Sequence, residues 1–407
     1  EPGAAVGATT DKILGLLGRL VEQSLVVAVN TGANGEQPRY RMLEPVRQYA
    51  QELLEESGEA EQVRRRHAAF FLALAERAEP EIRGPDQVEW LERLEQENGN
   101  LRAAMGWALS QDDVETAARL GWALWLFWWY RGHQREGRRW MEAVLEHELS
   151  PASRTKALMV AGSLSYGQGD YEQSEKYCRE CLKLSRQVGD ESRSGWAQAG
   201  LGLVAMARSD HEEAASLLEA AVRSLREADE DYGVALVHTF LGILALMGGE
   251  EDKATPMFEE SLAVARRLGD RPHTYIALYN LAQVALSRGD QDRAAALFEE
   301  AVTLSEQIGD RANVAYCLEG LAVVANARGD AERSACLIGA AEGLHETIGV
   351  PVYVYYEPHR SLYERTATAV RSRLGEEGFE AVRAEGRAMT FEHAVAYALD
   401  GDEASPE

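Results

Sequence analysis

Small and apolar residues recur in this chain with a period of 40 residues, from about residue 156 to residue 349. One position is small throughout and has an apolar or small residue directly before it: Ala161-Gly162, Leu201-Gly202, Leu241-Gly242, Leu281-Ala282 and Leu321-Ala322. Twelve, sixteen and nineteen residues later the side chains are small, bulky and small, as in Ala294, Phe298 and Ala301. A turn pair such as Gly289-Asp290 separates the two sets. This spacing predicts a hairpin of two helices that is repeated five times.

The spacing resembles the tetratricopeptide repeat, in which Leu-Gly marks the first helix and small, bulky and small residues mark the second. The usual period is about 34 residues. The six additional residues lengthen each hairpin by roughly one and a half helical turns. We expect the small positions to let neighbouring hairpins approach closely, and the second helices to end at Gly189, Gly269, Gly309 and Gly349. The resemblance implies a right-handed superhelix with a concave groove.

A different pattern precedes the repeats. An amphipathic helix is predicted from Asp11, followed by a strand over residues 24–29, a loop over 30–38 and a second strand over 39–43. Glu44-Pro45 opens another helix, because proline suits the first helical turn. Helix, strand, wing, strand and helix make up the back half of a winged-helix domain. The chain begins without methionine, and we expect it to be part of a longer protein.

Several strings carry a second resemblance. Residues 20–25 read LVEQSL, 39–50 read RYRMLEPVRQYA, 66–75 read RHAAFFLALA and 337–342 read LIGAAE. Over nearly its whole length the chain is similar to bacterial STAND-type signal-transduction ATPases, notably LuxR-like or AfsR-like transcriptional regulators. Those proteins hold ATP or ADP in an upstream module through a loop of the form G-x-x-x-x-G-K-[ST]. No segment here matches that loop. The resemblance therefore implies an upstream nucleotide-binding module in cis and no cofactor in this chain.

The patterns divide the chain into four parts. We expect a partial winged-helix domain with a two-stranded wing over residues 1–57, a helical connector over 58–112, a tetratricopeptide-repeat superhelix over 113–349, and a helical cap with an acidic tail over 350–407. The fold class is mainly α. The first hairpin, over about 113–149, is divergent. The cap is expected because the last repeat would otherwise expose its apolar face, and its helices are predicted at about 361–374 and 376–399.

Seven of the eight tryptophans lie between residues 87 and 147. Trp122, Trp125 and Trp129 share one helical face, and Phe127 with Trp128 covers another, so this helix is apolar nearly all round. We expect it in the core where the connector meets the first hairpin. The alternative is an aromatic pocket for a ligand.

The first helices of such a superhelix line its concave wall, and counting from the small position identifies the inward-facing side chains, which include Leu236 and Ile276. The candidate ligand-binding set is Tyr166, Trp196, Met206, Thr239, Tyr279, Gln283, Tyr316, Glu319 and Asn326. This mixture suits an effector peptide, a small molecule or a protein partner. A clamp for a C-terminal carboxylate is excluded, because the position that carries Lys, Arg or Asn in such clamps reads Met159, Ala199, Thr239, Tyr279 and Glu319.

The composition limits which partners the chain can bind and which kinds of chemical site it can contain. The formal net charge of -25 repels nucleic acid, and Arg39, Arg41 and Arg47 form a weak basic patch, so direct DNA contact by this chain is disfavoured. Cys178 and Cys181 form a C-x-x-C, but they occupy core positions of the repeat, which favours packing over a metal or redox site. The nine histidines are scattered and no nucleophile motif occurs, so no catalytic or metal site is predicted. With no signal peptide and no apolar run of 18 residues, we expect a cytoplasmic protein without membrane association.

The first hypothesis is a non-catalytic sensor and regulatory arm of a STAND-type ATPase, in which the repeats bind an effector and the winged helix relays the event. The alternatives are a free-standing repeat adaptor that joins proteins, or a peptide receptor that uses the same groove. A nucleotide-binding module upstream favours the first hypothesis over the others.

Overall fold

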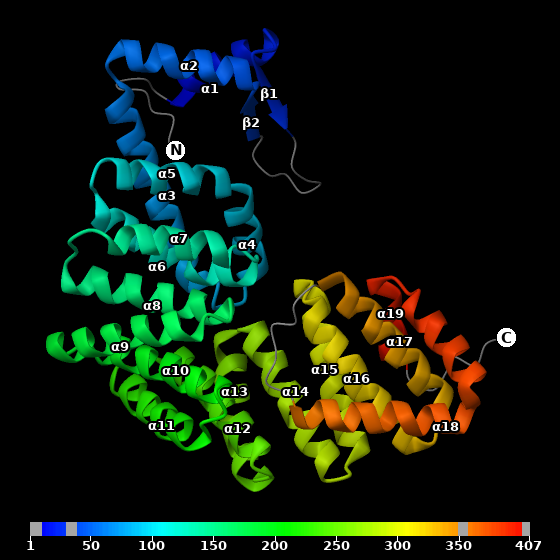
Figure 1. Ribbon diagram of the computed structural model, residues 1–407. Coiled ribbons are helices and arrows are strands. Elements are labelled where there is room, and N and C mark those ends of the chain that lie inside the picture. The colour runs from blue at the N-terminus through cyan, green and yellow to red at the C-terminus, as the bar shows by residue number, and fades with distance from the viewer. Residues whose placement is uncertain (1–9, 30–38, 349–356, 401–407) are drawn as a thin grey trace.

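The computed structural model describes residues 10–29, 39–348 and 357–400 of the chain. Its helices follow one long arc from the N-terminal part to the C-terminal cap (Figure 1). The mainly α fold is confirmed, and the described residues contain a single two-stranded sheet near the N-terminus.

The N-terminal part consists of α1 (Thr10–Glu22), β1 (Val26–Val29), β2 (Arg39–Met42) and α2 (Glu44–Ser57). The strands are antiparallel, with Val26 opposite Met42. Pro45 lies in the first turn of α2, and Gly58 ends this helix in the left-handed conformation with φ 75°. The order of elements is the predicted one. We call residues 10–29 and 39–57 the winged-helix part.

Three helices connect the winged-helix part to the repeats: α3 (Ala60–Glu81), α4 (Gln87–Gln96) and α5 (Asn98–Ser110). α3 packs against α5 and α6, with Phe71, Ala75 and Ala78 buried along its length. We call residues 82–86, the turn between α3 and α4, the corner.

Six helix hairpins follow in the described part of the chain: α6 (Val114–Tyr130) with α7 (Gln134–Leu145), α8 (Pro151–Gly167) with α9 (Tyr171–Val188), α10 (Glu191–Ala207) with α11 (His211–Glu227), α12 (Asp231–Met247) with α13 (Glu251–Leu268), α14 (Arg271–Ser287) with α15 (Gln291–Ile308), and α16 (Arg311–Arg328) with α17 (Ala331–Ile348). The five hairpins of period 40 and the divergent first hairpin lie where the sequence pattern predicts them.

The small position of a first helix receives the bulky residue of its own second helix. A Cβ added at Gly202 would lie 2.8 Å from Leu218 Cδ2, so these helices are in close contact at this point. The prediction that this position governs the approach of neighbouring hairpins needs correction, because the close contact forms within a hairpin. Neighbouring hairpins use another glycine, since a Cβ added at Gly320 would overlap the ring of Phe298 on the preceding second helix.

The turns supply the helix caps. The carboxylates of Asp170, Asp210 and Asp290 accept hydrogen bonds of 3.2, 3.1 and 3.1 Å from the backbone N–H groups three residues later, and so begin the second helices. Gly269 ends α13 with φ 73°, and Gly189 and Gly309 end α9 and α15 in the same way, as predicted. The predicted helix end at Gly349 lies outside the described residues.

The cap contains α18 (Glu357–Arg387), which bends at Gly375, and α19 (Phe391–Leu399). The predicted single helix over residues 376–399 is therefore wrong. Thr390 is extended, with φ -70° and ψ 165°, and its hydroxyl accepts a 3.3 Å hydrogen bond from the His393 N–H. This cap begins a new helix where apolar periodicity alone predicts continuation.

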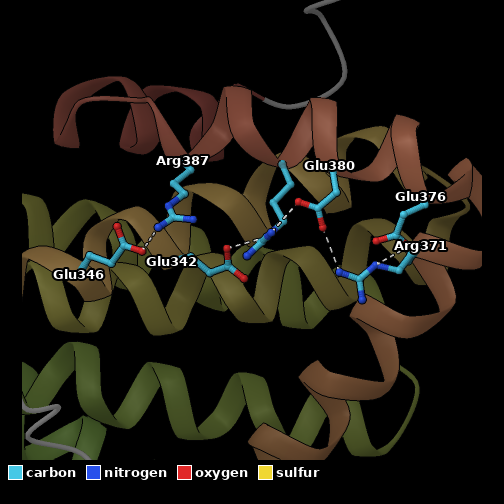
Figure 2. A network of polar contacts seen from close by, with 7 residues as sticks. Glu342, Glu346, Arg371, Glu376, Glu380 and Arg387 are labelled. Carbon is cyan, nitrogen blue, oxygen red and sulfur yellow. Dashed lines mark hydrogen bonds and ion pairs between the residues drawn. The ribbon is translucent and has the colours of Figure 1, made fainter.

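α18 lies very close to α17. A Cβ added at Gly386 would overlap the carbonyl oxygen of Cys336, so only glycine fits there. Ion pairs flank this contact, with Arg383 2.7 Å from Glu342 and Arg387 beside Glu346 (Figure 2). The cap therefore covers the last hairpin through backbone contact as well as side chains.

Candidate ligand-binding surface

The first helices of the hairpins form the inner side of the arc. α10 contacts both α8 and α12, and α14 contacts both α12 and α16, whereas the described second helices of neighbouring hairpins approach each other less. Curvature brings the helices on the concave side of a superhelix together. We call the solvent-facing side of α8, α10, α12, α14 and α16 the inner surface.

Most of the nine predicted residues lie within this wall and not on its surface. Six are at most 9% exposed: Tyr166, Trp196, Met206, Thr239, Tyr279 and Gln283. The other three, Tyr316, Glu319 and Asn326, are partly exposed. The structure brings Tyr279 and Tyr316 together, with ring centroids 6.3 Å apart, whereas Tyr166 belongs to α8, three hairpins from α14.

Thr239 and Glu319 occupy one position of the repeat, and both point toward the second helix of their own hairpin. Thr239 Oγ1 lies 2.8 Å from Ser261 Oγ on α13, and Glu319 Oε1 lies 3.1 Å from His345 Nε2 on α17. His345 also meets Tyr316 edge to face, with ring centroids 5.2 Å apart. Side chains at this position therefore connect the first helix to the second helix of the same hairpin.

A row of partly exposed apolar groups on the inner surface comes from a neighbouring position of the same register. Leu236, Ile276 and Tyr316 stand 40 residues apart on α12, α14 and α16, and each is partly exposed. Burial raises the pKa of Tyr316 to about 12, so its phenol remains a neutral hydrogen-bonding group. The register includes Leu236 and Ile276 among the inward-facing residues, but the selected set of nine omits them. Such a row suits the apolar side of a bound peptide or helix.

Aromatic rings continue the wall toward the N-terminus. The ring of Trp196 lies 5.5 Å from that of Trp125 and 6.0 Å from that of Tyr232, and Tyr232 lies 4.8 Å from His273. Trp125 donates a 3.0 Å hydrogen bond to Ser163 Oγ on α8. The rings thereby join helices α6 to α14.

The tryptophan-rich helix α6 lies in the core, as expected. Trp122, Trp125 and Trp128 are at most 8% exposed. The guanidinium of Arg193 lies over the ring of Trp122 at 3.7 Å, and burial lowers the pKa of Arg193. A ligand pocket among these rings was the alternative, but protein groups already cover them.

The cap reaches the C-terminal end of the inner wall. Arg373 of α18 donates to the Asn326 carbonyl oxygen at 3.4 Å, to Asn326 Oδ1 at 3.3 Å and to the Gly329 carbonyl oxygen at 3.3 Å. A cation is favourable at the C-terminus of a helix, here α16. Asn326, one of the predicted ligand residues, thus holds the cap in this structure.

The cysteines and the basic residues were the other candidates for chemistry. Cys178 and Cys181 are buried, and burial raises the pKa of each thiol to about 12. Among the described residues, no three His, Cys, Asp or Glu side chains are grouped so that they could hold a metal ion.

In the winged-helix part, Arg39 is bound to Glu97 at 2.5 Å and Arg47 to Glu44 at 2.6 Å. Two arginines of the basic patch are therefore engaged within the chain.

No helix in the described parts of the chain combines the length and the apolar character that a membrane crossing requires.

Comparison with known families finds two matches. Residues 154–227 and 233–307 match the tetratricopeptide repeat, and residues 4–55 match a winged helix-turn-helix domain. Both matches agree with the elements described above.

Among characterised proteins, the chain is 34% identical over 198 residues to proteins of Mycobacterium bovis and Mycobacterium tuberculosis that are named as candidate HTH-type transcriptional regulators. The match covers 46% of this chain and 22% of those proteins. The chain thus spans about a fifth of the length of these relatives.

Solved structures that share the fold include the following two. One is a signal transduction ATPase with numerous domains (STAND) and a tetratricopeptide repeat sensor from Pyrococcus horikoshii, with TM-score 0.53 and 15% identity over 93% of this chain and 59% of that protein. The other is a Rap protein complexed with Competence and Sporulation Factor, with TM-score 0.53 and 12% identity over 80% of this chain and 99% of that protein. At these identities the likeness establishes the fold alone.

Proposed function

We propose that this chain is the sensor and regulatory arm of a STAND-type signalling ATPase that acts as a transcription regulator. An effector peptide, small molecule or protein binds the inner surface, and the connector and winged-helix part pass the change to an upstream nucleotide-binding module in cis. The chain itself performs no catalysis. Residues 1–57, 58–112, 113–349 and 350–407 then act as relay, connector, sensor and cap.

The observation that carries the proposal is the combination of a winged helix and a tetratricopeptide superhelix in one chain. The names of the 34% identical relatives support a role in transcription. The STAND protein with a tetratricopeptide repeat sensor shares the fold over 93% of this chain, which supports a sensor role for the repeats. The Rap complex supports a bound effector as the signal.

The winged-helix part supports the upstream module. Among the described residues, the exposed large apolar side chains lie between positions 14 and 53, with the exception of Val188. Tyr49 is 62% exposed and Leu43 is 51% exposed, whereas Val26 alone is buried among the described side chains of this part. An apolar face of this kind marks a contact with another protein surface. We assign it to the nucleotide-binding module.

The test of the upstream module uses the complete gene product that carries this chain. We expect that protein to bind ADP or ATP, and Tyr49→Asp to change the rate of nucleotide release without lowering the melting temperature of the repeats. Val188→Asp places the same charge on the exposed apolar residue outside the winged-helix part and is the matched control. A gene product without a nucleotide-binding module, or equal release rates in the two variants, contradicts the proposal.

The test of the sensor surface begins with a screen of peptides and small molecules for a change in melting temperature. We place the effector contacts on Leu236, Ile276 and Tyr316, with the other predicted residues behind them. Ile276→Asn should then weaken binding of the screened effector about tenfold, because it removes an apolar contact from the inner surface. Leu217→Asn alters a partly exposed leucine on the second helix α11 and should leave the affinity unchanged. Equal affinities would exclude the inner surface.

A further inference from the structure

The corner between α3 and α4 is a compact turn with its own hydrogen bonds. The Gly84 N–H donates to the Glu81 carbonyl oxygen at 3.1 Å, and the buried Gln87 side chain donates to the Ile82 carbonyl oxygen at 2.7 Å. Ile82 is fully buried. The corner therefore moves as a unit with the end of α3.

The corner touches the repeats at a point far from the first hairpin. A Cβ added at Gly269 would lie 3.0 Å from Pro85 Cδ and 3.1 Å from Pro85 N, and one added at Gly84 would lie 3.9 Å from the Leu268 carbonyl oxygen. Leu268 and Gly269 form the end of α13. The corner thus passes the hairpins α8/α9 and α10/α11 and lies against the turn from α13 to α14.

Arg83 makes a second contact at the same place. Its guanidinium lies over the ring of Tyr232, at the start of α12, with 4.8 Å between Arg83 Cζ and the ring centroid. Glu79 holds Arg83 at 3.3 Å and also accepts a 3.1 Å hydrogen bond from Trp122 Nε1 on α6. We call the contacts of Pro85 with Gly269 and of Arg83 with Tyr232 the rim contact.

The rim contact departs from the usual rule for repeat proteins. Each hairpin of a superhelix contacts only its neighbours, so the curvature is the sum of small independent rotations. A link from the connector beside α6 to the turn after α13 closes a loop through four hairpins. Any change of curvature between α6 and α14 must then move the corner or break the rim contact. α3, about 33 Å long at 1.5 Å per residue, carries that movement to the winged-helix part.

We propose that the rim contact is a reversible latch: the start of α12 and the turn after α13 form a binding site for an arginine-containing turn, and the chain's own corner occupies it. An effector that alters the curvature of the inner surface opens the latch, and the end of α3 then moves relative to α12 and α13. The identity of this trigger rests on the proposed function, whereas the latch itself does not.

The features of the rim contact suit release. Arg83 contacts the rim through the ring face of Tyr232, its ion pair is with Glu79 of α3, and its Nε has no hydrogen-bond partner among the described residues. Pro85 is exposed on its outer side. Separation of the corner from the rim therefore leaves the hydrogen bonds of the repeat helices intact.

The test of the latch uses a matched pair of glycines. Gly269 and Gly309 end their helices with φ 73° and 77°, so alanine is strained equally at both, but only Gly269 faces Pro85, and no atom lies within 4 Å of a Cβ added at Gly309. The Arg83 side chain is only 17% exposed in the closed corner, and Gly269→Ala should expose it, so that trypsin cleaves the Arg83–Gly84 peptide bond. Hydrogen exchange of residues 82–87 should also be about tenfold faster in Gly269→Ala than in Gly309→Ala. Equal cleavage and exchange in the two variants overturn the latch.

The coupling is tested by the distance between spin labels at Gln51→Cys on α2 and Glu306→Cys on α15, both exposed, since the four native cysteines are buried. Gly269→Ala and Arg83→Met should broaden or shift this distance. Arg77→Met is the control: it removes a guanidinium that lies over the ring of Trp90 within the connector, and it should leave the distance between the labels unchanged. An unchanged distance in a variant whose corner has opened overturns the coupling. Neither measurement requires an effector, so failure of the proposed function alone would not alter them.

Discussion

At the C-terminal end of the superhelix, α18 lies so close to α17 that glycines meet the opposing backbone, and a row of ion pairs joins the two helices beside this contact. At the N-terminal end, the winged-helix part buries only Val26 among its described side chains and exposes residues such as Tyr49 and Leu53. The two ends contain similar numbers of described residues. They differ in how much apolar surface each buries within the chain.

This difference shows which end of the described chain buries its apolar side chains and which end leaves them in contact with solvent. A terminal repeat must be covered, and the cap covers the last one. Among its described residues, the winged-helix part leaves large apolar side chains such as Leu14, Leu43 and Tyr49 exposed. We infer that stability resides in the repeats and the cap, whereas association with other modules resides at the N-terminal end.

The sharpest way to break this comparison is to remove an aromatic ring from each region. Phe298 is fully buried between α14, α15 and α16, so Phe298→Ala should lower the free energy of unfolding by about 3–5 kcal/mol. Tyr49 is 62% exposed, so Tyr49→Ala should change the free energy of unfolding by less than about 0.5 kcal/mol. Urea unfolding followed by circular dichroism measures both. Similar losses in the two variants would show that the winged-helix part also contributes to the cooperative core.

The next effect concerns the helix contact of the cap. Gly386→Ala should destabilise the cap by about 1–3 kcal/mol, because its methyl group overlaps the Cys336 carbonyl oxygen and the backbones must separate. Gly378→Ala lies on the same helix with its nearest contact at 3.6 Å, and it should be neutral or stabilising. Hydrogen exchange of residues 366–387 and the melting temperature report the change. If Gly378→Ala is as harmful as Gly386→Ala, close backbone contact is not what holds the cap.

A smaller effect is expected from the ion pairs in Figure 2. Arg383→Met breaks the 2.7 Å pair with Glu342 and should cost up to about 1 kcal/mol at low salt, and less at high salt, because partly exposed pairs are screened. Arg47→Met breaks an exposed pair in the winged-helix part and is the control. Thermal melting at two ionic strengths tests this, and a loss that does not depend on salt would indicate packing instead of charge.

The smallest effect is a dependence on pH. Burial lowers the pKa of His238 from its ordinary value of 6.5, against the opposing influence of Glu260 at 3.1 Å. The neutral form is therefore the stable one in the fold, so its contribution is complete above pH 6.5 and declines as the pH falls below that value. His238→Gln should reduce the loss of stability between pH 7.5 and pH 5.5, with His393→Gln on the exposed side of α19 as control. Residues 1–57 contain no histidine, so this dependence should be absent from the winged-helix part.

Much of the fold followed from local patterns. The 40-residue period, the glycine ends of α9, α13 and α15, and the helix–strand–strand–helix order of the winged-helix part could all be predicted, because each depends on contacts within one hairpin or one turn. The break at Thr390 was missed, because apolar periodicity continues through it and a single cap decides the outcome.

Only part of the candidate site could be predicted from the sequence. The register correctly assigns Tyr279 and Gln283 to the first helices, but the structure buries both, and it leaves Leu236 and Ile276 in contact with solvent. Inward direction is a property of one helix, whereas exposure depends on how far two neighbouring helices separate. No local signal marked Arg83, since its partner ring on Tyr232 belongs to a distant hairpin.

By itself, the sequence determined the 40-residue period, the order of the elements in the winged-helix part and several glycine ends of the repeat helices, because these properties arise from neighbouring residues and repeat along the chain. Only the tertiary structure decided that the corner reaches the turn after α13, that α18 contacts the end of the wall, and that the described residues of the winged-helix part leave large apolar side chains exposed. The reach of the corner depends on the accumulated curvature of four hairpins, because small rotations that no single repeat reveals add up to set it. The other two depend on which segments pack against each end of the superhelix.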